Sequence, residues 1–105
     1  MYHVAPADYN KGEDVYSMNQ LIEMGYEVEY KWAADCPLED YPDADIVSMT
    51  ETLEEAEEIL ALNFSGKGII IVIDDSILED AFRNSEGYWS VYDWIEADYI
   101  TGYNN

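Results

Sequence analysis

The sequence predicts a single α+β domain with a mixed or mainly antiparallel sheet and two main helices. Three observations lead to this prediction. Runs of β-branched and aromatic residues are separated by turn residues, two segments carry apolar residues at helical spacing, and the two kinds of segment alternate along the chain. At 105 residues and 49% hydrophobic content, the chain can bury one modest core. We therefore expect residues 1–105 to form one acidic domain.

The first half of the chain predicts a strand, a helix, a second strand and a loop. Tyr2–Val4 is a short apolar run typical of a strand. Residues 13–24 predict the first main helix, because their apolar side chains have helical spacing and Gly25 is a suitable C-terminal stop. Residues 25–32 alternate between aromatic or apolar and charged side chains, which predicts a half-buried strand. The two prolines of residues 34–44 predict a loop.

The middle of the chain predicts a strand followed by the second main helix. Asp45–Met49 is expected to be the strand. The helix is expected over residues 52–62, where Thr52 and Glu55 have the spacing of a capping box. Its inner face would be apolar and its outer face almost entirely carboxylate.

The last part of the chain predicts the centre of the sheet and its late strands. Ile69–Ile73 lacks polar alternation, which indicates a strand buried on both faces. Residues 76–83 could form a short third helix. Tyr88–Asp93 and Tyr99–Tyr103 predict two late strands around a turn at residues 95–98.

Charge is the dominant compositional feature. The chain has 24 Asp and Glu residues, a formal net charge of −20, and acidic residues along its whole length. Direct binding of DNA, RNA or anionic lipid needs clustered Lys and Arg, so this composition argues against it. Only four basic residues are present, and they are scattered: Lys11, Lys31, Lys67 and Arg83.

The sequence also predicts a cytoplasmic location without membrane association. Met1 is followed by neither a basic segment nor an apolar signal region. No run approaches the roughly 18 apolar residues that span a membrane. Cys36 has no second cysteine to pair with, which favours a reducing compartment.

Metal sites are not expected. The chain has one histidine and one cysteine, too few for a structural zinc site of the usual kind. Residues 8–12 begin like a calcium-binding EF-hand loop, but the glycine is misplaced and Asn19 stands where the loop needs its final Glu.

Four segments together resemble small ADP-ribosyltransferase-like domains. They are YHVAP (2–6), DIVSMTETLEEAEEIL (45–60), GKGIIIVID (66–74) and WIEADYI (94–100). The resemblance implies an enzyme that uses NAD, with His3 as the family's first-strand histidine, which holds the ribose and carboxamide. Met49 or Thr50 stands where the family usually has Tyr or Ser. The late catalytic Glu would be Glu86 or Glu96. Without the resemblance, His3 is expected to be an ordinary sheet residue with one hydrogen bond.

The spacing of the carboxylates suggests a different function, which needs no cofactor. In and before the predicted second helix, acidic residues recur three or four positions apart, so their side chains would lie about 5–6 Å apart. Residues 27 and 29 lie two positions apart on a predicted strand, roughly 6.5–7 Å apart. Such rows imitate a polyanion and would attract a basic groove. The acidic residues concerned are Glu27, Glu29, Glu51, Glu54, Glu55 and Glu58.

These observations favour a binding protein over an enzyme. The leading hypothesis is a phage- or mobile-element-encoded inhibitor of anti-CRISPR or anti-restriction type, a nucleic-acid mimic that binds a basic DNA- or RNA-binding protein in a bacterial host. Aromatic residues near its late strand, namely Tyr88, Trp89 and Tyr92, could add apolar anchors. Packing in the core is the ordinary alternative for these rings. The charge is also compatible with salt adaptation or with an immunity or antitoxin protein that neutralises a basic nuclease.

Overall fold

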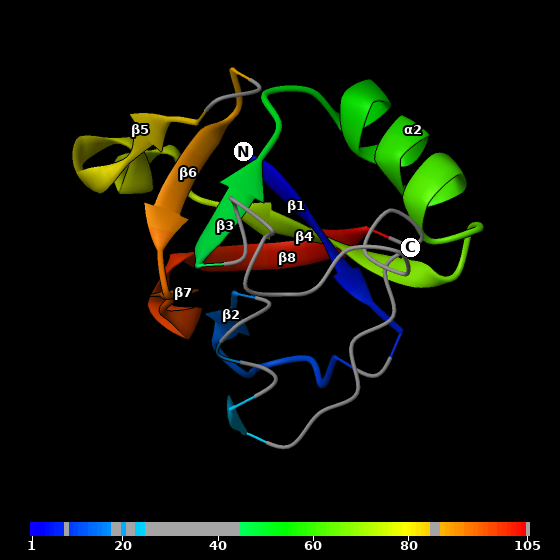
Figure 1. Ribbon diagram of the computed structural model, residues 1–105, viewed down its shortest axis with the longest axis horizontal. Coiled ribbons are helices and arrows are strands. Elements are labelled where there is room, and N and C mark those ends of the chain that lie inside the picture. The colour runs from blue at the N-terminus through cyan, green and yellow to red at the C-terminus, as the bar shows by residue number, and fades with distance from the viewer. Residues whose placement is uncertain (8, 18–19, 21–22, 25–44, 85–86, 105) are drawn as a thin grey trace.

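The computed structural model describes residues 1–7, 9–17, 20, 23–24, 45–84 and 87–104 (Figure 1). The strand predicted over residues 25–32, with Glu27 and Glu29, and the loop predicted over residues 34–44 lie outside the described residues.

The largest sheet of the described structure is built around the apolar run that the sequence places at its centre. β4 (Gly68–Ile73) lies between β1 (Tyr2–Pro6) and β8 (Ile100–Asn104), and both pairings are antiparallel. The register places Tyr2 opposite Val72. The predicted central strand and the predicted strands at both ends of the chain are therefore confirmed.

The other described strands form two smaller antiparallel sheets. One has the order β3-β6-β5 and contains β3 (Ile46–Met49), β6 (Trp89–Tyr92) and β5 (Phe82–Arg83). The other pairs β2 (Val15–Tyr16) with β7 (Trp94–Ile95). Together with the helices, these sheets confirm the predicted α+β fold.

The helix α2 (Leu53–Asn63) covers one face of the largest sheet (Figure 1). It begins as predicted, because the Thr52 hydroxyl accepts a hydrogen bond of 3.2 Å from the main-chain N–H of Glu55. Buried Ala56 packs with Val4 and Ile70, and four half-buried helix residues surround this contact: Leu53, Ile59, Leu60 and the cap residue Phe64. The apolar stripe of α2 therefore faces the sheet and leaves most of its acidic residues in solvent.

The main core lies on the opposite face of β4. Ile71 and Ile73 pack there with residues from the two smaller sheets, including Val47, Val91 and Ile95. Because Ile70 faces α2 while Ile71 faces this core, β4 is buried on both sides. This double burial explains why its sequence lacks polar alternation.

The first predicted helix is wrong at its beginning. Val15 and Tyr16, which were expected to be helical, form the strand β2 because they pair with Ile95 and Trp94 of β7. Val and Tyr favour strands when a partner strand is present. Gln20 and Glu23 are helical, and the rest of the predicted helix falls partly on residues outside those described.

The third predicted helix is shorter than expected. Residues 75–80 form the 3₁₀-helix η2 (Asp75–Asp80), and Asp74 caps it by accepting from the main-chain N–H of Ser76 at 2.9 Å. Phe82 and Arg83 pair with β6 instead of continuing the helix. The turn predicted over residues 95–98 instead holds the end of the strand β7 (Trp94–Ile95) and most of a second 3₁₀-helix, η3 (Ala97–Tyr99).

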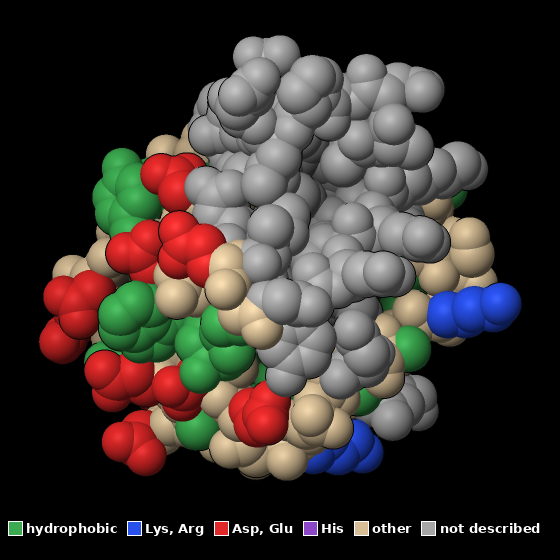
Figure 2. Space-filling model, turned by 60° about the horizontal axis from the view of Figure 1, so that its bottom comes forward, with side chains coloured by type: hydrophobic (Ala, Val, Ile, Leu, Met, Phe, Trp, Pro, Cys, Tyr) green, Lys and Arg blue, Asp and Glu red, His purple; other side chains and the backbone are tan. Residues whose placement is uncertain are grey.

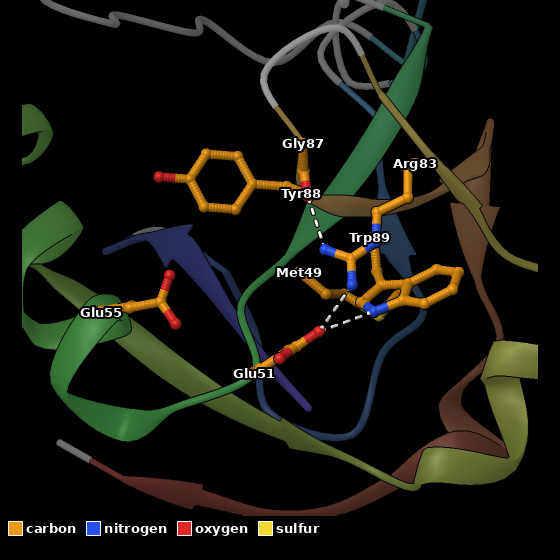
Figure 3. A pocket seen from close by; sticks show the side chains of 7 residues that line it. All are labelled: Met49, Glu51, Glu55, Arg83, Gly87, Tyr88 and Trp89. Carbon is orange, nitrogen blue, oxygen red and sulfur yellow. Dashed lines mark hydrogen bonds and ion pairs between the residues drawn. The ribbon is translucent and has the colours of Figure 1, made fainter.

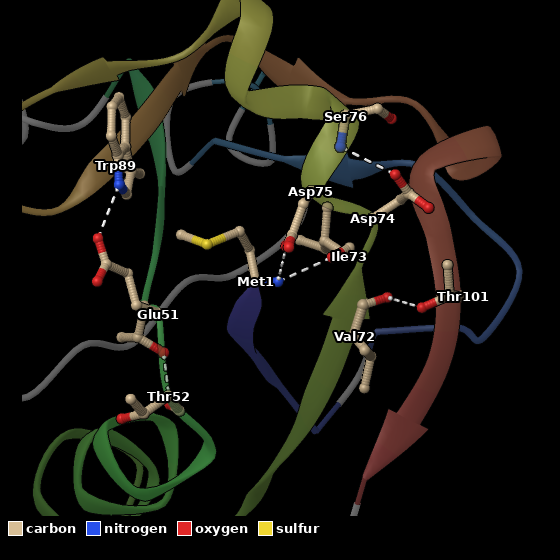
Figure 4. A network of polar contacts seen from close by, with 11 residues as sticks. Met1, Glu51, Thr52, Val72, Ile73, Asp74, Asp75, Ser76, Trp89 and Thr101 are labelled. Atoms are coloured by element: carbon tan, nitrogen blue, oxygen red, sulfur yellow. Dashed lines mark hydrogen bonds and ion pairs between the residues drawn. The ribbon is translucent and has the colours of Figure 1, made fainter.

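The amino group of Met1 extends the pairing of the central strand (Figure 4). It donates to the carbonyl of Ile73 and to the carboxylate of Asp75, each at 2.9 Å. Among the described helices, none has the length and apolar character needed to cross a membrane.

Candidate partner-binding surface

The solvent face of α2 is a row of carboxylates. Glu54, Glu57 and Glu58 are exposed, and Glu55 is half-buried. The last turn of the helix contains no basic residue. Within the described structure none of the three exposed glutamates forms an ion pair, so their charges face solvent uncompensated.

Glu51 differs from the helical glutamates because it precedes the N-cap and lies outside the helix. One of its oxygens accepts hydrogen bonds from Arg83 Nη2 and from the indole N–H of Trp89, each at 2.9 Å. The Glu51 and Arg83 side chains are both more than half exposed, so the ion pair alone adds little to stability. The ion pair instead helps to position the Glu51 carboxylate, which accepts hydrogen bonds from two donors.

Arg83 is held on three sides. Its guanidinium lies over the Trp89 ring at 4.4 Å from the ring centroid, and Nη1 donates to the carbonyl of Gly87 at 2.7 Å. Together with the bond to Glu51, these contacts fix a planar cation against an aromatic face, an arrangement that suits arginine better than lysine.

These residues line a pocket of about 290 Å³ between the start of α2 and the β5–β6 hairpin (Figure 3). Glu55 extends from α2 on one side, while Glu51, Arg83 and Trp89 lie on the other. Tyr88 and Gly87 contribute from the hairpin, and Met49 completes the lining. With two carboxylates and one guanidinium, the lining has a net negative charge and suits a cationic group better than an anion.

The structure brings together only part of the predicted surface. Four of its residues line the pocket, namely Glu51, Glu55, Tyr88 and Trp89. Glu54 and Glu58 lie on the exposed face of the adjoining helix. Tyr92 lies at the other end of β6, where it is 63% exposed and stacks on Phe82.

Two contributors were missed by the sequence analysis. Glu57 belongs to the exposed face of α2, and the helical spacing of the glutamates could have revealed it. Arg83 was treated only as one of four scattered cations, although it is the one basic residue that lines the pocket. Its contact with Glu51 joins residues 32 positions apart, which no local pattern reveals.

His3 has the surroundings of a structural residue. Its Nδ1 lies 2.7 Å from the carbonyl oxygen of Ser48, so Nδ1 carries the proton and donates. Burial lowers the pKa of His3, and the hydrogen bond to Ser48 opposes this effect only in part. No hydrogen bond or ion pair of the described residues joins His3 to Glu96, which precedes η3, and Glu86 lies outside the described residues.

Metal ligation finds no support in the part of the chain that the structure describes, where no group of three His, Cys, Asp or Glu side chains is placed to hold an ion. Comparison of the chain with protein-family models, with curated proteins and with solved structures gives no match.

Proposed function

We propose that this protein is a small inhibitor that binds the basic groove of a DNA- or RNA-binding protein and takes the place of the nucleic acid. An anti-CRISPR or anti-restriction role in the cytoplasm of a bacterial host fits this activity. The observation that carries the proposal is the exposed face of α2, where Glu54, Glu57 and Glu58 have no basic neighbour on the helix.

The geometry of this face resembles a segment of polyanion. Residues three or four positions apart on a helix have side chains about 5–6 Å apart, which is wider than the roughly 3.4 Å of rise per phosphate on a single DNA strand but of the same order. A groove lined with Lys and Arg would therefore meet closely spaced negative charges along one turn of α2. A net charge of −20 would also speed the encounter at low salt.

Binding would also remove a repulsion that the free protein contains. Like charges three or four positions apart destabilise a helix by a few tenths of a kcal/mol per pair. Glu54 forms such pairs with Glu57 and Glu58. Because cations of a partner would relieve these repulsions, the free energy of association includes a favourable term that a neutral helix lacks.

The test compares two charge-reversed variants that carry the same net charge. In the first, Glu54→Lys, Glu57→Lys and Glu58→Lys alter α2; in the second, Glu13→Lys, Glu23→Lys and Glu79→Lys alter exposed positions elsewhere. Displacement of fluorescent DNA would be measured by anisotropy for an RNA-guided nuclease, a restriction endonuclease and a basic nuclease toxin. We expect the natural chain and the second variant to displace DNA from at least one of them, and the α2 variant to fail.

Equal displacement by both variants would exclude α2 as the contact, provided that circular dichroism shows both to be folded. Displacement from none of the three enzymes by the natural chain would contradict the inhibitor function for these classes. A His3→Ala variant distinguishes the inhibitor from the NAD-dependent enzyme. If the protein is an inhibitor, loss of His3 should leave DNA displacement intact, whereas an enzyme should lose its activity on NAD. Displacement from the nuclease toxin alone would favour the immunity or antitoxin role.

A further inference from the structure

A second surface of the molecule exposes two aromatic rings in succession. Tyr92 is 63% exposed and Trp94 is 45% exposed, and Asp93 between them is also exposed. Val91 and Ile95 on either side are buried in the core. A regular strand alternates between its two faces, so three successive outward residues require a local change in the backbone.

Asp93 provides that change. Its φ of 64° lies in the left-handed region, which a non-glycine residue adopts only at a cost. Its N–H donates to the carbonyl of Asp45 at 2.8 Å, and its carbonyl accepts from the N–H of Ser17 at 2.7 Å. Asp93 therefore joins the residue before β3 to the residue after β2 through its backbone. Its conformation holds the aromatic residues on either side of it in solvent.

The Tyr92 ring is held in place by a neighbouring ring, and Trp94 is fixed at its backbone. Tyr92 stacks on Phe82 of β5 with ring centroids 4.7 Å apart and an angle of 28° between the planes. Trp94 is paired through its backbone with Tyr16. Aromatic side chains that are already ordered lose little entropy on binding, which makes them effective anchors at protein contacts.

Acidic residues accompany this aromatic pair along the chain, with Asp45 hydrogen-bonded to the Asp93 backbone, and the described cations lie elsewhere. Asp45, Asp93, Glu96 and Asp98 are all exposed. Figure 2 shows acidic and hydrophobic side chains interspersed on the left of the view, the side on which β6 and β7 lie in Figure 1. The three described basic side chains are placed at the Tyr103 ring, the turn before β4 and the pocket: Lys11, Lys67 and Arg83.

This surface is separate from the pocket. Trp89 and Tyr92 are three positions apart on β6, so their side chains lie on opposite faces of that strand. A second copy of the chain is a poor occupant, because its own net charge of −20 would repel this acidic surface.

We propose that Tyr92, Trp94 and the accompanying carboxylates form a docking surface for an arginine-rich segment of a partner protein. A guanidinium can stack on an aromatic ring and donate to a carboxylate at the same time, whereas a lysine ammonium lacks the planar face for stacking. The same geometry occurs among the described residues, where Arg83 lies over Trp89 and donates to Glu51. The docking surface does not depend on binding through α2.

The test uses two peptides of equal charge, one of nine arginines and one of nine lysines, titrated into the ¹⁵N-labelled full chain. We expect the arginine peptide to shift the Trp94 indole resonance and the amides of residues 92–94, and to bind more tightly than the lysine peptide at 0.3 M NaCl. The double variant Tyr92→Ser/Trp94→Ser should lose about 5- to 30-fold in affinity for the arginine peptide. Leu62→Ser, at a hydrophobic residue on α2 that is 62% exposed, should lose none.

Equal affinity of the two peptides, or unchanged affinity in the double variant, would overturn the proposal. The single variant Trp94→Ser guards against a folding defect, since it leaves the Tyr92–Phe82 stack intact. The α2 variant Glu54→Lys/Glu57→Lys/Glu58→Lys should keep its preference for arginine. If it loses that preference, the peptide binds at α2 and the docking surface is wrong, whatever the outcome of the DNA displacement assay.

Discussion

Gly68 allows α2 and β1 to approach the start of β4. A Cβ at this position would lie 2.6 Å from the carbonyl oxygen of Ala5 and 2.9 Å from a methyl carbon of Leu60. The Ala5 oxygen belongs to the backbone of a paired strand and cannot easily move. We expect Gly68→Ala to lower the free energy of unfolding by about 1–3 kcal/mol, measured by urea denaturation.

Gly102→Ala is the matched control for this substitution. Gly102 also lies in a strand of the same sheet, but its Cβ would meet no atom within 4 Å. Alanine there should be neutral or stabilising by less than about 1 kcal/mol. Equal destabilisation by both substitutions would show that the close approach at Gly68 is not the cause.

His3 should make stability depend on pH. Burial lowers the pKa of His3 in the folded protein below the ordinary value of 6.5, so the unfolded chain binds the proton more readily. The free energy of unfolding should therefore fall as the pH drops from about 6.5 toward the folded pKa, by at most about 1.4 kcal/mol per pH unit. The comparison is with His3→Asn, which retains a donor for the Ser48 carbonyl but does not titrate.

Only the difference between the two proteins isolates His3, because the many carboxylates titrate in both. Urea denaturation between pH 7.5 and 5 should show the natural chain losing stability relative to His3→Asn as the pH falls. A difference that stays constant over this range would mean that His3 is not protonated on unfolding.

At the scale of the elements, α2 is capped at its beginning and electrostatically unfavourable at its end. Its last turn contains no basic residue, although cations there interact favourably with the helix dipole. Leu62→Lys would place a cation in that turn, four positions after Glu58, and remove an exposed hydrophobic side chain. We expect a gain of roughly 0.5–1.5 kcal/mol in the free energy of unfolding.

Thermal and urea denaturation would measure this gain, with Leu62→Gln as the uncharged control. The advantage of Lys over Gln should shrink in 1 M NaCl, since both contributions are electrostatic. An advantage that salt does not change would show that it is not electrostatic, whereas a gain shared by Lys and Gln would come from removal of the exposed leucine.

Elements with a strong local signal could be predicted from the sequence. The uninterrupted apolar run of β4 and the capping box of Thr52 and Glu55 each depend on neighbouring residues, and both are found where expected. The two-residue strand β2 could not be predicted in this way. Val15 and Tyr16 are strand residues because Trp94 and Ile95 pair with them from the far end of the chain.

The candidate site also combines features that the local sequence predicts with features that depend on distant contacts. The acidic face of α2 follows from helical periodicity, whereas the pocket depends on contacts between distant segments. Glu51 was predicted as part of the acidic row, but the N-cap at Thr52 leaves it outside the helix and within reach of Arg83 and Trp89. Likewise, the outward position of Trp94 depends on the left-handed conformation of Asp93, which the sequence does not signal.

At the scale of the whole molecule, self-repulsion should dominate the response to salt. The chain has a formal net charge of −20, and the described residues contain only two ion pairs, one of them made by the amino group of Met1. Screening reduces repulsion in the compact state more than in the expanded unfolded chain. We expect the midpoint of thermal unfolding to rise steadily between 0.02 and 0.5 M NaCl.

A variant of lower charge provides the control for this expectation. Glu54→Gln/Glu57→Gln/Glu58→Gln removes three charges from α2 and should show a higher midpoint at low salt and a smaller increase with NaCl. If both proteins respond equally, the repulsion on α2 contributes nothing measurable. A fall in the midpoint with salt would contradict the electrostatic explanation altogether.

The position of β4 has a consequence for the newly made chain. Its partners lie far from it in sequence, with Tyr2 opposite Val72 and Ile71 opposite Tyr103, so the sheet cannot close until β8 has been synthesised. Such distant pairings make folding slow. Until then the segment GIIIVI has an unpaired, apolar strand edge, and edges of this kind initiate aggregation. The acidic residues that surround it in sequence would hold neighbouring nascent chains apart during this interval, whatever they bind afterwards.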